Sequence, residues 1–78
     1  MIKSRNLQAI LDEYDAAVQK YEEFNSAHEG FAILKEEVDE LWDEVKKKPS
    51  ERSSKRMREE ATQIAAMAIR FLEDVCEP

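Results

Sequence analysis

The 78-residue sequence contains few of the residues that break helices or crosslink chains. It has one glycine, two prolines and one cysteine, Cys76. A single cysteine excludes an internal disulfide framework and is typical of a reducing compartment. The scarcity of glycine and proline, beside many Glu, Lys, Ala and Leu residues, predicts an all-α protein.

An excess of positive charge and a long apolar run are also missing. The formal net charge is −6, which argues against general nucleic-acid binding, because phosphate backbones attract cations. No apolar run approaches the roughly 20 residues that span a bilayer. The start of the chain, residues 1–5, has no apolar core of a signal peptide. We therefore expect a cytoplasmic protein without a nucleic-acid or membrane partner.

Apolar residues recur at steps of three and four along three segments, which predicts a bundle of three helices in one domain, residues 1–78. The first helix is expected at about residues 4–24. The second begins at Ser26, where Ser26 and Glu29 match a capping box in which each side chain bonds the other residue's amide. It ends before Pro49, and the third runs from about residue 55 to 75.

Each predicted helix carries one stripe that we expect to be buried. In chain order, the stripes are Leu7, Ile10, Leu11, Tyr14, Ala17, Val18, Tyr21 and Phe24; then Ala27, Phe31, Leu34, Val38, Leu41 and Val45; then Met57, Ala61, Ile64, Ala68, Phe71 and Val75. Between residues 61 and 72 only Thr62, Gln63 and Arg70 are polar, so this part of the third helix needs neighbours on several sides. Two other helices would hardly cover it. We therefore expect a homodimer or homotetramer, with Arg70 paired to a neighbouring subunit or extended outward.

Acidic residues gather in Glu36-Glu37-Val38-Asp39-Glu40 and, after nineteen further residues, in Glu60-Ala61-Thr62-Gln63. If the second and third helices form an antiparallel hairpin, Glu37 and Glu40 can meet Glu60 across the seam. Three carboxylates and the amide oxygen of Gln63 make an all-oxygen site, which suits Mg²⁺ or Mn²⁺ rather than zinc. Glutamate is also common on exposed helix surfaces, so a solvated acidic face is the alternative.

The segment from His28 to Val45 resembles the MazG-like branch of the all-α nucleoside triphosphate pyrophosphohydrolases. That family is marked by Glu-Glu-x-x-Glu and, after a gap, Glu-x-x-Asp. Glu36, Glu37 and Glu40 match the first element, and Glu60 opens the second. The resemblance covers about residues 25–75. The chain departs from it at Gln63, where the family has aspartate.

The resemblance implies a helical oligomer that hydrolyses (d)NTP to (d)NMP and pyrophosphate, as in housecleaning of the nucleotide pool. It implies Mg²⁺ held by Glu37, Glu40, Glu60 and Gln63, and a catalytic role for Glu36, Glu37 and Glu40 in orienting or deprotonating the attacking water. Because Gln63 brings no charge, the alternative is a non-catalytic oligomerisation or adaptor module with a lapsed metal site.

Four further residues are candidates for contacting the substrate. His28 could meet a base or phosphate, although a surface or capping role fits it as well. Trp42 could stack on a base or pack in the core. Lys55 and Arg58 belong to a basic loop between the second and third helices, which could steer a triphosphate toward the site. Helix capping and solubility explain that loop equally well.

Overall fold

Three α-helices account for most of the chain in the computed structural model, which describes residues 1–77. They are α1 (Ser4–Lys20), α2 (Ala27–Val45) and α3 (Ser54–Phe71). A short 3₁₀ turn, η1 (Pro49–Glu51), lies between α2 and α3, and a π-helical turn, η2 (Leu72–Cys76), continues α3. The described residues include no strand, so the all-α prediction is confirmed.

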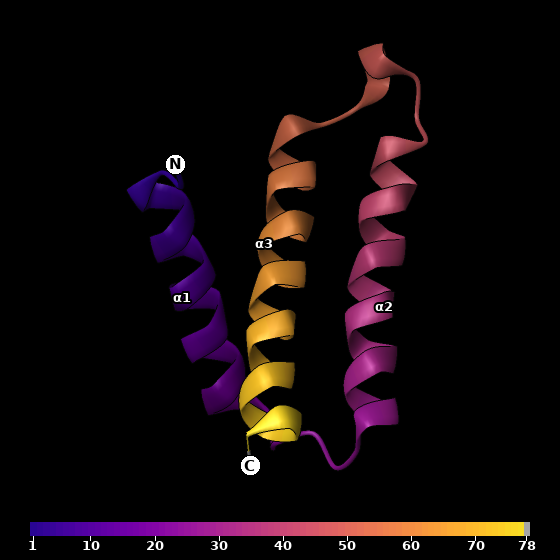
Figure 1. The fold of residues 1–78 in the computed structure, drawn as a ribbon. Helices are drawn as coiled ribbons and strands as arrows, with labels where there is room; N and C mark the ends of the chain where they lie inside the picture. Colours follow the sequence, from indigo (N-terminus) through magenta and orange to yellow (C-terminus); the bar gives the residue numbers. More distant parts are fainter. Residues whose placement is uncertain (78) are drawn as a thin grey trace.

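The helix α3 lies between α1 and α2 and packs against both (Figure 1). It runs antiparallel to α2, forming the expected hairpin, and parallel to α1. Over residues 1–77, α1 and α2 have almost no contact with each other. The three helices therefore lie side by side in the order α1, α3, α2. No helix in this described range has the length and apolar character needed to cross a membrane.

The first helix ends at Lys20, so the prediction that it reaches Phe24 is wrong. Tyr21 is extended, with φ −120° and ψ 151°. This turn allows the Phe24 ring to be buried and its amide to donate to Asp74 Oδ2 at 3.2 Å. Tertiary contacts with the end of α3 thus override the helical periodicity of this segment.

Of the two hydrogen bonds predicted for the capping box of α2, one is confirmed and the other is wrong. The Glu29 amide donates to Ser26 Oγ at 3.1 Å, as predicted. The Glu29 carboxylate accepts from the Asn25 amide at 2.9 Å and from Asn25 Nδ2 at 3.2 Å. It therefore fixes the residue before the cap rather than the amide of Ser26, and so joins the loop to the helix.

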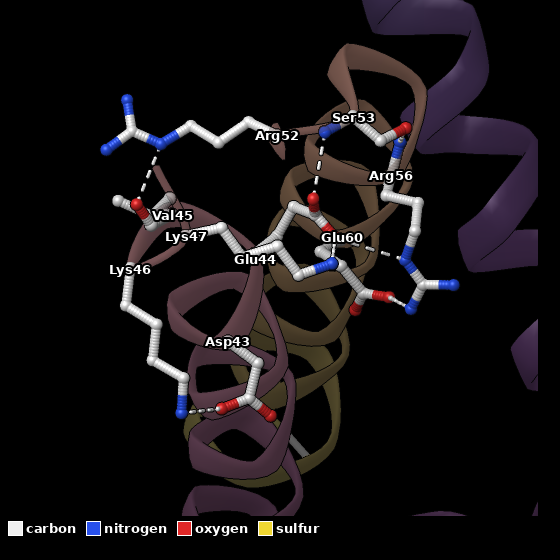
Figure 2. Close-up of polar contacts among 9 residues, drawn as sticks. All are labelled: Asp43, Glu44, Val45, Lys46, Lys47, Arg52, Ser53, Arg56 and Glu60. Atoms are coloured by element: carbon white, nitrogen blue, oxygen red, sulfur yellow. Dashed lines mark hydrogen bonds and ion pairs between the residues drawn. The ribbon is translucent and has the colours of Figure 1, made fainter. Parts of the chain in front are cut away.

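Glu44 joins the C-terminal part of α2 to the start of α3 (Figure 2). This role was not predicted from the sequence. This carboxylate is only 3% exposed. It accepts from the Ser53 amide at 2.8 Å and from Lys47 Nζ at 3.0 Å, and Arg56 Nε lies 3.4 Å away. These contacts, the Ser53 hydrogen bond first, lower the pKa of Glu44 below its ordinary value. Glu44 is thus a buried charged link between α2 and the residue that precedes α3.

The predicted buried stripes are only partly correct. The core consists of Ala17, Phe24, Ala66 and Met67, and five further side chains pack against it: Tyr14, Ile33, Leu34, Phe71 and Val75. Eight stripe residues are instead exposed: Leu7, Leu11, Val18, Tyr21, Ala27, Phe31, Val38 and Ala61. The helices are rotated relative to the prediction, because α2 turns Gly30 and Glu44 inward rather than the centre of its apolar stripe.

Gly30 explains part of this rotation. A Cβ added at this position would lie 2.8 Å from Phe71 Cδ2 and 3.0 Å from Phe24 Cδ2. Two aromatic rings therefore approach the α2 backbone closely. The contact at this glycine is thus made by side chains rather than by a neighbouring backbone.

Candidate functional site

Three glutamates from two helices converge between α2 and α3. Glu37 and Glu40 lie about one turn apart on α2, and Glu60 lies on the facing side of α3. One carboxylate oxygen from each lies within 4.8 Å of the others. The antiparallel hairpin therefore brings together the three carboxylates singled out from the sequence.

This proximity disfavours full ionisation of the cluster. Burial, followed by the nearby charges of Glu40 and Glu60, raises the pKa of Glu37 from 4.5 to about 7. Burial and the neighbouring Glu40 also raise the pKa of Glu60. Like charges held close together are stabilised either by a shared proton or by a cation.

Glu60 contributes an oxygen atom that either a shared proton or a cation would satisfy. Its Oε2 atom is buried and has no hydrogen-bond partner. Its Oε1 atom lies 4.0 Å from Arg56 Nη2 (Figure 2). A buried carboxylate oxygen without a partner is costly. The oxygen-only donor set and this unpaired atom fit a hard divalent cation.

The cluster lies in a cleft of about 890 Å³ between the three helices. This volume falls in the range of roughly 300–1,000 Å³ that is usual for ligand pockets. Glu36 and Gln63, which the sequence analysis grouped with the cluster, line the same cleft. Lys20 and Arg70 are its only basic lining residues among those described, against eight glutamates: Glu13, Glu22, Glu23, Glu29, Glu36, Glu37, Glu40 and Glu60.

None of the four predicted substrate-contacting residues lines this cleft. Trp42 is 59% exposed, so it neither lines the cleft nor packs in the core. Arg58 Nη1 donates to Asn6 Oδ1 at 2.8 Å and ties α3 to α1. His28 and Lys55 are exposed. The structure thus separates these residues from the carboxylate cluster.

The aromatic residues of the cleft are Tyr21 and Phe24, which sequence reasoning assigned to a buried helical stripe. They follow the end of α1 and cover Arg70, whose guanidinium carbon lies 4.2 Å from the Phe24 ring centroid. The one available signal was the polar pair Asn25-Ser26, which marks a break immediately after them.

Arg70 does not extend outward, so that part of its prediction is wrong. It is 3% exposed, its Nη2 donates to the Glu22 carbonyl at 2.9 Å, and it lies 4.0 Å from Asp74 Oδ2. Its Nε atom is buried without a hydrogen-bond partner. Arg70 thus joins α3 to the turn after α1 within one subunit.

Besides Lys55 and Arg58, four basic side chains around the loop bind to groups of the hairpin itself: Lys46, Lys47, Arg52 and Arg56. Lys46 pairs with Asp43 at 3.1 Å, and Arg52 Nε donates to the Val45 carbonyl at 2.8 Å (Figure 2). Lys47 and Arg56 contact Glu44, as described above. These contacts favour the capping interpretation of the loop over a role in steering a substrate.

Neither a protein-family model, nor a curated protein, nor a solved structure matches the chain. The functional argument therefore depends on the residues of the cleft and on their geometry.

Proposed function

We propose that the chain is a metal-dependent nucleoside triphosphate pyrophosphohydrolase of the MazG-like kind, acting in the cytoplasm on the nucleotide pool. It would cleave (d)NTP to (d)NMP and pyrophosphate with Mg²⁺, or with Mn²⁺. The observation that carries this proposal is the convergence of Glu37, Glu40 and Glu60 around the unpaired Oε2 atom of Glu60.

The residues of the cleft divide into two roles. Glu37, Glu40 and Glu60 would hold the cation, and the carbonyl oxygen of Gln63 is a fourth candidate ligand on the same wall. Once bound, the cation would offset negative charge on the phosphate oxygens. Glu36 lines the cleft outside the cluster, and this position suits it to orient the attacking water.

The charge of the cleft sets the order of binding. Eight glutamates against Lys20 and Arg70 repel a free triphosphate. The triphosphate is therefore expected to enter only together with its cation, which neutralises both the cluster and the phosphates. Binding of nucleotide in the presence of a chelator would contradict this mode of recognition.

The decisive experiment measures pyrophosphate release from canonical and modified (d)NTPs with Mg²⁺ or Mn²⁺. Glu60→Gln keeps the shape of the side chain and removes its charge, so it should abolish turnover in a folded protein. Glu40→Ala should do the same. The matched control is Glu59→Gln, an exposed neighbour outside the cleft, which should leave turnover unchanged.

The alternative is a non-catalytic helical module on the same scaffold. The neutral Gln63, in place of an expected aspartate, favours it. A folded protein that releases no pyrophosphate from any nucleotide, and that gains no stability from the cation, would support this alternative. In both cases we infer self-association into a homodimer or homotetramer.

A further inference from the structure

Two buried polar side-chain atoms have no hydrogen-bond partner within the described residues 1–77: Oε2 of Glu60 and Nε of Arg70. Both residues line the same cleft. The Glu60 atom is an acceptor in the carboxylate cluster, whereas Arg70 carries only donors. The cleft therefore has an acceptor end, where the proposed cation binds, and a donor end at Arg70, which the proposed function does not use.

The hydrogen-bonding capacity of Arg70 is mostly unused, although the residue is buried. Of its five N–H groups, one donates to the Glu22 carbonyl at 2.9 Å and one contacts the Met67 thioether, a weak acceptor, at 3.6 Å. Asp74 Oδ2 lies 4.0 Å from Nη2, which is too far for a hydrogen bond. A buried charge that is incompletely paired is costly. Arg70 would therefore gain from one further acceptor.

The Met67 contact places part of the guanidinium beside the cleft. Met67 lines the cleft but not the smaller cavity, of about 530 Å³, that Arg70 also borders. Long side chains of a helix lean toward its N-terminus, and the contact of Nη1 with a residue three positions earlier agrees with this direction. A ligand oxygen that replaced the thioether would substitute a strong acceptor for a weak one.

The charge of the cleft restricts the kind of acceptor that can bind there. Its eight glutamates repel a phosphate or carboxylate group that brings no cation. An uncharged carbonyl oxygen is not repelled in this way, and a guanidinium donates readily to such an oxygen, as it does to O6 of guanine. The donor end of the cleft therefore suits a neutral carbonyl group.

Tyr21 gives the donor end a surface for a flat ring. It is 56% exposed and lines the cleft. Arg70 Cζ lies 6.0 Å from its ring centroid, and Lys20 Nζ lies 5.3 Å from it. Aromatic side chains stack on every nucleobase, so a hydrogen bond at the edge of the base must supply any selectivity. An exposed ring beside an incompletely paired donor suits a base with a carbonyl at its edge.

The two ends of the cleft are separated by the length of an extended nucleotide. Arg70 follows Glu60 by ten positions on α3, a rise of roughly 15 Å. We propose, on the basis of the proposed function, that the donor end selects nucleotides whose base is a 6-oxopurine or a 4-oxopyrimidine. An amino group at the same position of the base would set its N–H groups against those of Arg70.

Two pairs of ligands test the proposal in the unmodified protein: hypoxanthine against adenine, and uracil against cytosine. Each is supplied with Mg²⁺ as the α,β-imido triphosphate, which cannot release pyrophosphate, so calorimetry measures binding alone. The carbonyl member of each pair should bind roughly 10- to 100-fold more tightly, as expected for one hydrogen bond to a charged group. Equal affinities, tighter binding of the amino member, or no binding of any of the four would overturn the proposal.

The matching hydrolysable triphosphates separate this inference from the proposed function. Preferential binding of the carbonyl members, without pyrophosphate release from any triphosphate, would support the base preference and overturn only the proposed hydrolysis. Pyrophosphate release with equal kcat/KM for both members of each pair would support the hydrolysis and overturn only the base preference.

Two substitutions in the cleft assign the donor. Arg70→Lys keeps the charge and removes the planar donor group, so it should bring the members of each pair to nearly equal affinity. Lys20→Met removes the other basic residue of the cleft and should keep the preference. A preference lost in Lys20→Met and kept in Arg70→Lys would overturn the assignment to Arg70. If Arg70→Lys does not fold, the ligand pairs and Lys20→Met decide.

Discussion

Gln63 follows Glu60 by about one helical turn on α3 and lines the same cleft as the three clustered glutamates. Its amide oxygen brings no charge to the site. We expect Gln63→Asp to tighten Mn²⁺ or Mg²⁺ binding by roughly tenfold, since a further carboxylate near a cation is worth about 1 kcal/mol or more. Isothermal titration calorimetry measures this change.

Gln63→Asn is the matched control, because asparagine has the length of aspartate without its charge. We expect it to bind cations no better than the unmodified chain. An equal gain from both variants would mean that side-chain length, rather than charge, limits the site. If Gln63→Asp also raises pyrophosphate release, the neutral residue retunes an active site rather than marking a lapsed one.

Glu37 links the pH to the stability of the metal-free protein. Its pKa is 4.5 ordinarily and about 7 in the folded chain, so the folded state keeps a proton that the unfolded state has lost between these values. Stability should therefore fall as the pH rises through this window. Thermal midpoints measured in a chelator from pH 5 to 8 report the slope, and Glu37→Gln should flatten it.

Glu44 affects the pH dependence of stability in the opposite direction from Glu37. Its lowered pKa contributes stability that is present above the ordinary value of 4.5 and is lost as the pH falls below it. Together, the two carboxylates place the stability maximum of the metal-free protein near roughly pH 5. A midpoint that rises steadily toward pH 8 without a cation would contradict the assignment of the cluster.

At the scale of the elements, Gly30 controls how α2 meets α3. An alanine Cβ would lie 2.8 Å from Phe71 Cδ2, so Gly30→Ala must displace that ring. Overpacking costs about 1–3 kcal/mol, and the gain in helix propensity offsets roughly 0.5–1 kcal/mol of it. We expect a net loss of about 1 kcal/mol in chemical denaturation. In a Phe71→Leu background the loss should shrink, because the smaller side chain leaves room for the methyl group.

The helices themselves were predictable, since scarce glycine and proline and a strong 3.6-residue period specify them locally. The rotation of each helix about its own axis was not predictable, because the sequence of a helix with apolar residues on more than one side does not show which side meets its neighbour. On α2 the buried residues are Gly30 and Glu44. Because neither has a large apolar side chain, the apolar pattern does not identify the side of α2 that meets α3. The end of α1 was missed for a related reason, since the burial of Phe24 against Arg70 is a tertiary contact.

The acidic cluster was predictable in part, because the spacing along α2 and an antiparallel α3 allow Glu37, Glu40 and Glu60 to meet. Their convergence also depends on the rotation of the two helices, which the sequence did not specify. The remaining wall of the cleft was not predictable, because Tyr21 and Phe24 reach it through the turn after α1. Residues chosen by chemical type alone, such as Trp42 and Arg58, lie elsewhere.

At the scale of the whole molecule, the cation and the fold are coupled. The cluster carries the unpaired Glu60 Oε2 atom, so ions should bind the folded chain and not the unfolded one. Free Mn²⁺ at about 100 times its Kd would then add about 2.7 kcal/mol of stability and raise the thermal midpoint by roughly 10–20 °C. Differential scanning calorimetry at fixed protein concentration measures the shift.

Two controls separate this site from general screening of the net charge of −6. Potassium chloride at equal ionic strength should raise the midpoint far less, since it weakens repulsion without occupying the cluster. Glu60→Gln should remove the response to Mn²⁺ while keeping the response to potassium chloride. An undiminished Mn²⁺ shift in Glu60→Gln would place the ion elsewhere on this acidic surface and would leave the cleft without its proposed cofactor.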